Sequence, residues 1–251
     1  MKSCSLPPSS VGVARYKAFP APRNPDALRA GIPGELRKHP VYAYIVTSIK
    51  ATSPGSSLHQ RGSAPNFSGG RITLCTCKHK DRATFFKKPH DPNYRWKNVW
   101  IAGFTSKTEV HSRGLAYLMC VERSFLSQFE LWHALSVDCR QAKSASSSAL
   151  GDLFKPKKTA ADDPYNPANY FRPVAGHVHS CPVNPDAWHH DIMQWGRSLE
   201  PHPLLLGQKA QSYRWSNVKM AFKPAVMGVS AHHKRFKSLE MFIKSLEEYI
   251  P

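Results

Sequence analysis

The sequence has few acidic residues and no long apolar run. Seventeen Asp and Glu residues stand against 35 Lys and Arg, so the formal net charge is +18 with His neutral. A charge of this size favours a polyanionic partner. No stretch approaches the roughly eighteen consecutive apolar residues of a membrane span, and the N-terminus lacks the apolar core and cleavage site of a signal peptide. We therefore expect a soluble, cytoplasmic protein that does not bind a membrane.

Cysteine and glycine are also scarce. Six Cys residues in 251 are sparse for a disulfide framework, so the sequence favours reduced thiols. Fourteen Gly residues against 21 Pro residues favour ordered loops over long helices, which disfavours a helical bundle. The hydrophobic content of 41% is nevertheless sufficient for a core.

Several common catalytic and cofactor motifs are missing. The chain has no Gly-x-x-x-x-Gly-Lys-Ser/Thr loop, no Gly-x-Gly-x-x-Gly turn, no Gly-x-Ser-x-Gly elbow and no His-Glu-x-x-His pair. P-loop, Rossmann, hydrolase and zincin interpretations therefore lose support. The sequence does not identify a cofactor, which stays unknown.

The hydrophobic pattern predicts one folded domain after an N-terminal extension. Residues 1–38 are rich in Pro and Arg without a lasting period, which predicts a poorly ordered extension, and residues 39–251 form the domain. Helical spacing is expected from Ser124 to His133, and an amphipathic helix with Ser238 as N-cap is expected from Ser238 to Ile250. Four runs of β-branched and aromatic residues predict strands: 41–47, 71–77, 98–104 and 115–122. The expected fold class is α+β, with a curved, mostly antiparallel sheet, long loops and a C-terminal helix.

The first candidate site combines a turn-rich loop with basic residues near the end of a strand. Backbone N–H groups of a Gly/Pro/Asn loop can bind a phosphate or a base, and Lys or Arg donors add charge-assisted hydrogen bonds. This pattern favours an anionic ligand, while a solvated basic turn explains it equally well. The candidate binding residues are Pro65, Asn66, Thr73, Cys77, Lys78 and Arg82.

The second candidate site contains histidines and an aspartate. An Asp can hold an imidazole in one tautomer, so His179 and Asp191 are candidates for proton transfer, with Ser180 orienting a ligand. The alternative is that these histidines satisfy loop carbonyls.

Two further patterns leave a metal site and base stacking open. Cys75, Cys77 and His79 alternate, as do His177, His179 and Cys181, but neither trio has a standard zinc spacing, so packed free thiols are favoured. Tyr94-Arg95-Trp96-Lys97 and Tyr213-Arg214-Trp215 alternate aromatic and basic residues, which suits either nucleobase stacking or half-buried strands.

At these residues the chain resembles the nucleotide modification associated domain family, type two, whose members are inferred to act in DNA base hypermodification in phages and bacteria. The resemblance covers about residues 41–250, but His79 stands where the family has Pro. Tyr213-Arg214-Trp215 also replaces a late aromatic-Gly segment. The matching pieces, in order, are Tyr42-Ala43-Tyr44-Ile45-Val46, Gly62-Ser63-Ala64-Pro65-Asn66, Thr73-Leu74-Cys75-Thr76-Cys77-Lys78, Arg82, Trp100-Ile101-Ala102-Gly103 and Leu115-Ala116-Tyr117-Leu118-Met119-Cys120-Val121. A weaker match follows at Asn169-Tyr170-Phe171-Arg172, His179-Ser180, Asp191, Pro203-Leu204-Leu205-Leu206-Gly207 and Tyr213.

The resemblance implies a nucleic-acid or nucleotide base-modifying enzyme, a group transferase on DNA bases being the leading hypothesis. The first candidate site, with Tyr213, would then bind the phosphate or base, and His179 with Asp191 would serve as acid–base pair. The alternatives are a noncatalytic reader of modified bases, or a toxin or defence effector that modifies nucleic acid. The expected partner is nucleic acid, DNA above RNA, or a nucleotide.

Overall fold

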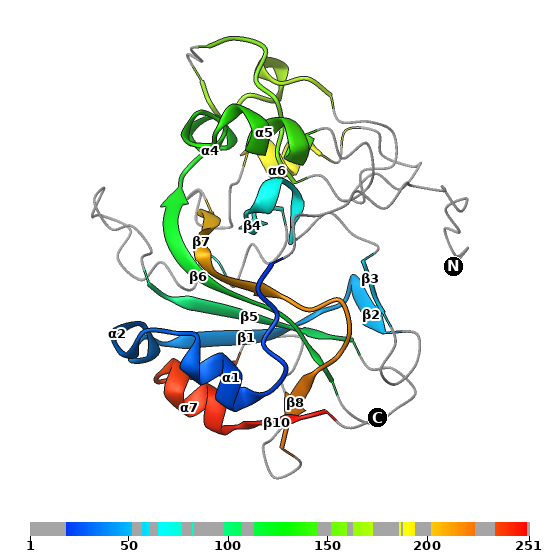
Figure 1. Cartoon of the computed structure of the whole chain (residues 1–251). Coiled ribbons are helices and arrows are strands. Elements are labelled where there is room, and N and C mark those ends of the chain that lie inside the picture. Colours follow the sequence, from blue (N-terminus) through cyan, green and yellow to red (C-terminus); the bar gives the residue numbers. More distant parts are fainter. Residues whose placement is uncertain are drawn as a thin grey trace.

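A six-stranded sheet forms the centre of the computed structural model (Figure 1). The strand order is β4-β7-β6-β5-β1-β9, in which β1 and β5 run parallel and every other neighbouring pair runs antiparallel. This confirms the predicted α+β class with a mostly antiparallel sheet. The structure describes residues 19–51, 57–60, 65–76, 82, 98–106, 113–144, 152–159, 163–172, 186, 188–193, 202–223 and 234–249.

Each of the four predicted strands overlaps a strand of the main sheet, whereas β7 and β9 were not predicted. β5 and β6 pair antiparallel, and β6 bends strongly along its length (Figure 1). The strands are β1 (Val41–Val46), β4 (Thr73–Leu74), β5 (Trp100–Thr105), β6 (Leu115–Phe125), β7 (Leu204–Arg214) and β9 (Lys234–Phe236). Two small antiparallel pairs join β2 (Ile49–Ala51) to β3 (Leu58–Gln60), and β8 (Met220–Phe222) to β10 (Leu246–Glu248).

The described helices are short and lie at two ends of the sheet. The α-helices α1 (Pro25–Ala30), α2 (Gly34–Arg37) and α7 (Leu239–Lys244) lie together at one end (Figure 1). At the other end lie α4 (Gln128–Ala134), α5 (Val137–Ser144) and α6 (His189–Met193), with 3₁₀ turns η1 (Ser68–Gly70) and η2 (Pro167–Asn169). None of the described helices is long and apolar enough to cross a membrane.

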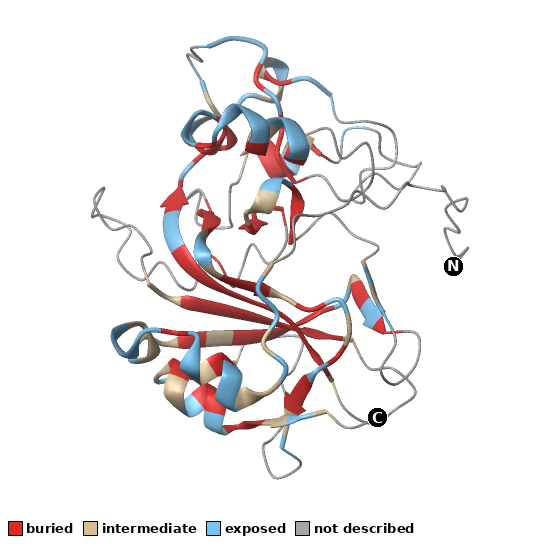
Figure 2. Ribbon diagram, in the orientation of Figure 1, coloured by how far each residue is buried: buried red, intermediate tan, exposed pale blue. Residues whose placement is uncertain are grey.

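Alternation along β1 divides the core between the two faces of the sheet. Val41, Ala43 and Ile45 pack with α1 and α7, whereas Tyr44 and Val46 pack on the opposite face. Successive side chains of a strand point to opposite faces, so a strand that is apolar throughout is buried on both. Figure 2 shows the central strands buried along most of their length.

Three expectations about element boundaries are wrong. Residues 25–38 are not poorly ordered: Asn24 caps α1 by accepting from Ala27 N at 2.8 Å, and Leu28 is fully buried. A helix was expected from residue 124, but β6 stays extended to Phe125. The reason is that the last residues of β6 pair with Leu204–Leu206 of β7. At the C-terminus Ser238 does cap α7, but the helix stops at Lys244 and the chain continues as β10.

Gly103 is required in β5 because the sheet packs too closely for a side chain there. An added Cβ would lie 2.1 Å from Tyr117 Cε1 and 2.7 Å from Val46 Cγ2. We expect Gly103→Ala to lower the free energy of unfolding by about 1–3 kcal/mol or more through overpacking. Urea unfolding measures this loss of stability. Gly34→Ala serves as the control, because a Cβ added at Gly34 would meet only Arg37 Nη2, at 3.6 Å. Equal losses in both variants would contradict the close approach.

Candidate functional site

A fully buried polar network surrounds Thr73 at the edge of the main sheet. Thr73 Oγ1 donates to Asp152 Oδ1 at 3.0 Å and accepts from Lys143 Nζ at 3.1 Å. Lys143 also donates to the carbonyls of Asn66 and Arg71, at 3.0 and 2.8 Å. A buried charge is costly unless it is paired or hydrogen-bonded. Lys143 of α5 and Asp152 both find partners at Thr73 of β4, so the network holds α5 and the segment at Asp152 against β4.

Asn66 of the predicted loop enters this network through its backbone and through its side-chain amide. Asn66 and Thr73 exchange two backbone hydrogen bonds, of 2.9 and 3.0 Å, and Asn66 Oδ1 accepts from Ser68 N at 2.9 Å. Pro65 is buried beside them, and its carbonyl accepts from Gln60 Nε2 at 2.7 Å. The structure therefore brings Pro65, Asn66 and Thr73 together, beneath the surface.

Arg82 is also buried and joins two parts of the backbone. Its guanidinium donates to Cys75 O at 2.6 Å and to the carbonyls of His202 and Pro203, just before β7. Arg82 thus lies next to the Thr73 network, and these contacts link the end of β4 to the start of β7. Its predicted phosphate-binding role stays a prediction, as do those of Cys77 and Lys78, which lie outside the described residues.

Burial shifts the ionisation of this network. Desolvation raises the pKa of Asp152 and lowers the pKa of Lys143, because each loses the hydration of its charged form. The attraction between the two charges opposes both shifts. Burial likewise raises the pKa of Cys75 well above its ordinary value.

The described thiols are expected to be unreactive. Cys75, Cys120 and Cys139 are free and buried, and burial raises the pKa of Cys120 to about 12. Since the thiolate is the nucleophile, we expect iodoacetamide at pH 8 to alkylate these three at least about tenfold more slowly in folded protein than in urea. Peptide mapping measures each site. Equal rates in both states would contradict the burial.

An open surface pocket of about 480 Å³ lies between η2 and α6, and we call it the η2–α6 hollow. Its volume falls in the usual range of small-molecule sites, about 300–1,000 Å³. Two aromatic rings and several polar or basic side chains line it, among them Tyr170, Trp188, Asn166, Lys157, Arg172 and His189.

The aromatic wall of the hollow is held by a small apolar cluster. Tyr170 and Trp188 pack with Phe154 and Ile192, and the Phe154 and Trp188 ring centroids are 5.7 Å apart. The Tyr170 hydroxyl donates to Pro164 O at 2.6 Å. Trp188 Nε1 is buried and has no acceptor among the residues that the structure describes.

The same short segment contacts both the Thr73 network and the hollow. Asp152 belongs to the network, and Phe154, two residues later, packs on Trp188. Gln128 of α4 holds this segment, donating to Asp152 O at 3.0 Å and accepting from Phe154 N at 3.4 Å. The two candidate regions therefore lie at the same end of the molecule, joined by residues 152–154.

The predicted site residues of the second cluster are only partly described. Asp191 lies in α6, 1% exposed, two residues after His189 of the hollow. His179 and Ser180 lie outside the described residues. Asp191 is thus carried by a helix that lines the hollow, and its acid–base role stays a prediction.

Tyr213 lies apart from the other predicted residues. It packs in the cluster beneath α1 and α7, and its hydroxyl donates to Gln211 Oε1 at 3.1 Å. It lies seven positions further along β7 than Leu206, the pairing partner of Thr73. The structure therefore does not bring Tyr213 to the Thr73 network.

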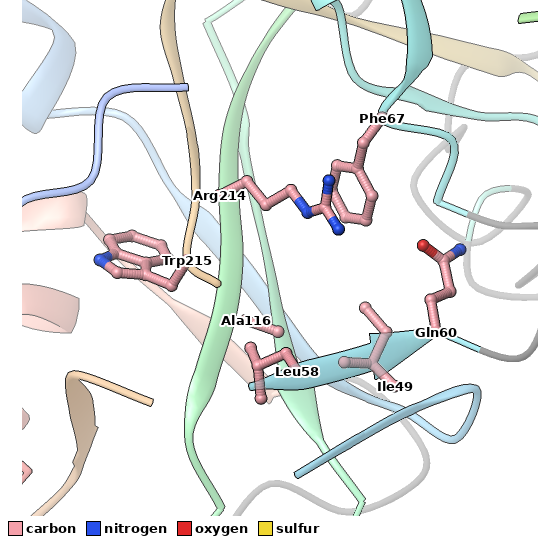
Figure 3. Close-up of a pocket in the computed structure, with 7 residues that line it drawn as sticks. All are labelled: Ile49, Leu58, Gln60, Phe67, Ala116, Arg214 and Trp215. Carbon is pink, nitrogen blue, oxygen red and sulfur yellow. The ribbon is translucent and has the colours of Figure 1, made fainter. Parts of the chain in front are cut away.

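The predicted aromatic-basic motif at 213–215 is occupied by core contacts. Trp215 is 1% exposed and donates to Pro22 O at 2.7 Å, and Arg214 lies 4.5 Å from the Phe67 ring centroid (Figure 3). The cavity beside them, lined also by Ile49 and Gln60, is about 10 Å³ and has room for one water at most. Residues 213–215 therefore fit the half-buried alternative rather than base stacking. The other motif, Tyr94–Lys97, lies outside the described residues.

No cluster of three His, Cys, Asp or Glu side chains able to hold a metal occurs among the described residues. Cys75 is described, but Cys77, His79 and the His177, His179 and Cys181 trio are not. The zinc question raised by those trios therefore stays open.

The sequence reading missed residues that define both regions. Lys143 and Asp152 were not singled out, because their local sequence does not distinguish a buried charge from an exposed one. Lys157 was not singled out either, and Arg172 entered only as part of the resemblance.

Comparisons with models of known protein families, with curated proteins and with solved structures find no significant match to this chain.

Proposed function

We propose that this chain binds a nucleotide or nucleic acid and modifies a base, and that the η2–α6 hollow is where the base or its phosphate binds. One observation carries the proposal: the hollow, about 480 Å³, combines aromatic rings with basic side chains. Nucleotides need both, because a base stacks on aromatic faces and a phosphate pairs with cations.

The aromatic side of the hollow suits a base. Tyr170 and Trp188 form its apolar wall, only 1% and 5% exposed, and Asn166 adds a side-chain amide whose Oδ1 accepts from Ala168 N at 2.9 Å.

The basic side suits a phosphate. Lys157 and Arg172 are exposed at the hollow, and His189 adds a ring 4.5 Å from the Trp188 ring centroid. The net charge of +18 further favours attraction of a polyanion. The Asp186 carboxylate also lies beside His189, with its Oδ1 3.9 Å from His189 Nε2, and adds a negative charge to this side.

The reaction class rests on the resemblance. Two of its pieces, residues 169–172 and Asp191, belong to the segments that line the hollow or carry its lining. We therefore retain base modification by group transfer as the proposed activity, with His179 and Asp191 as the proposed acid–base pair.

Mass spectrometry tests this proposal directly. Purified full-length protein is incubated with DNA, RNA and nucleotides, each with a small-molecule extract that supplies group donors. A mass shift on a base is expected, and Arg172→Ala and His179→Ala are expected to abolish or weaken it. Binding without any mass shift would support the noncatalytic reader instead, and absence of both binding and mass shift would overturn the proposal.

A further inference from the structure

A short two-stranded bridge places basic and aromatic side chains beside the η2–α6 hollow. Pro156 bridges Tyr170, Lys157 N donates to Asn169 O at 2.8 Å, and Phe171 N donates to Lys155 O at 2.9 Å. Side chains alternate across such a bridge. Pro156 and Tyr170 are buried, whereas Lys155, Lys157 and Phe171 are exposed.

Phe171 is an exposed aromatic ring in a cationic setting. It is 49% exposed, and Lys155 Nζ lies 5.3 Å from its ring centroid. Its neighbour Tyr170 already fills the inward position, so packing of the core does not require Phe171 to be aromatic. An exposed ring beside cations is the arrangement on which nucleic-acid bases stack.

Exposed basic residues lie next to Phe171 in the sequence and on the paired segment at 155–158. Lys155, Lys157, Lys158, Phe171 and Arg172 are all exposed, and we call them the basic-aromatic ledge. Lys157 and Arg172 also line the η2–α6 hollow, so the ledge begins at the hollow's rim. The hollow and the ledge therefore share Lys157 and Arg172, while Phe171 lies on the ledge outside the lining of the hollow.

We propose that the substrate is single-stranded nucleic acid, with one base in the η2–α6 hollow and a neighbouring base stacked on Phe171. This inference rests on the proposed function and narrows its substrate class. Lys155, Lys157 and Lys158 pair with the phosphate that joins the two nucleotides and with the phosphates that flank them. In a duplex the base faces are already covered by their neighbours, so a ring on the ledge has no face to stack on unless the strand is opened.

Length-dependent binding tests the inference. The full chain is titrated with fluorescein-labelled thymidine oligomers of one, two, four and eight nucleotides, as DNA and as RNA, and with a blunt eight-base-pair duplex. Affinity is expected to rise from the mononucleotide to the short oligomers, because only the oligomers reach Phe171. Phe171→Ala is expected to weaken oligomer binding by about fivefold or more and to leave mononucleotide binding unchanged.

Two further variants separate stacking from general damage. Phe171→Trp keeps a stacking surface and is expected to bind the oligomers at least as tightly as the wild type. Met241→Ala removes an equally exposed apolar side chain of α7, 51% exposed, at the other end of the molecule, and is expected to change nothing.

The outcomes distinguish the two proposals. One outcome would overturn the single-strand inference and leave the proposed function standing. In that outcome Arg172→Ala weakens mononucleotide binding, but oligomer affinity depends neither on oligomer length nor on Phe171→Ala. Equal or tighter binding of the duplex would also overturn the inference. Failure of every nucleotide and oligomer to bind would overturn both.

Discussion

Replacement of Asp152 by alanine is expected to lower the free energy of unfolding by about 3–5 kcal/mol. The Asp152 carboxylate is fully buried, accepts from Thr73 Oγ1 and from Cys75 N, and is the largest favourable influence on the charge of Lys143. Its removal leaves the Lys143 ammonium buried without an opposite charge. Urea unfolding followed by circular dichroism measures the loss.

A double-mutant cycle shows whether Lys143 and Asp152 act as a pair. Lys143→Met alone is expected to lower the free energy of unfolding as much as Asp152→Ala does. The double variant is expected to lose clearly less stability than the sum of the two single losses. Asp138→Ala, an exposed acid in the first turn of α5, serves as control and is expected to cost less than about 1 kcal/mol. Additive losses would contradict a coupled network.

The same variants carry a pH dependence of known sign. The pKa of Asp152 is raised by burial, so its contribution to stability is present below its unfolded pKa and is lost as pH rises through the folded pKa. The pKa of Lys143 is lowered by burial, so its contribution is present above its unfolded pKa and is lost as pH falls through the folded pKa. Urea unfolding of the wild type and the double variant at several pH values measures the two contributions.

Removal of both rim cations of the hollow is expected to weaken nucleic-acid binding by about 10–100-fold, which corresponds to about 1.4–2.7 kcal/mol. Lys157 and Arg172 are exposed at the hollow, and each phosphate contact releases counterions from the nucleic acid. For Lys157→Ala/Arg172→Ala, the slope of log affinity against log salt is expected to fall by about one for each cation removed. Fluorescence anisotropy between 50 and 200 mM salt, roughly the range over which such contacts are lost, measures both effects.

A charge-matched variant controls for the overall field. Lys219→Ala/Lys244→Ala removes two exposed cations near β8 and in α7, at the opposite end of the sheet from α6. It is expected to change affinity by less than about threefold, because exposed charges beyond a Debye length are screened. Equal losses in the two double variants would show that binding follows net charge alone.

Local pattern was sufficient for much of the fold. The β-branched and aromatic run of β1 and the Ser238 cap of α7 are short-range signals, and both appear where they were expected. The end of α7 was misjudged because β10 pairs with β8, and this long-range contact overrides the helical period after Lys244. The same reason explains why β6 extends past the expected start of a helix.

The candidate site depended more on distant contacts. Lys143 and Asp152 meet Thr73 across 70 and 79 positions, and nothing in their local sequence indicates a common partner. Arg82 looks like a surface cation in sequence, but it is buried because the backbone carbonyls before β7 offer it acceptors. The η2–α6 hollow likewise requires residues 157–172 to meet α6, which sequence spacing does not specify.

Photo-crosslinking tests most directly whether the η2–α6 hollow binds nucleic acid. Single-stranded oligomers that carry 5-iodouracil at one position are bound to the full chain and irradiated, and the crosslinked peptides are identified by mass spectrometry. Crosslinks are expected at Tyr170, Phe171 or Trp188, and Lys157→Ala/Arg172→Ala is expected to reduce them. Crosslinks confined to other parts of the chain, at a protein concentration where binding is saturated, would contradict the assignment of the hollow as the binding site.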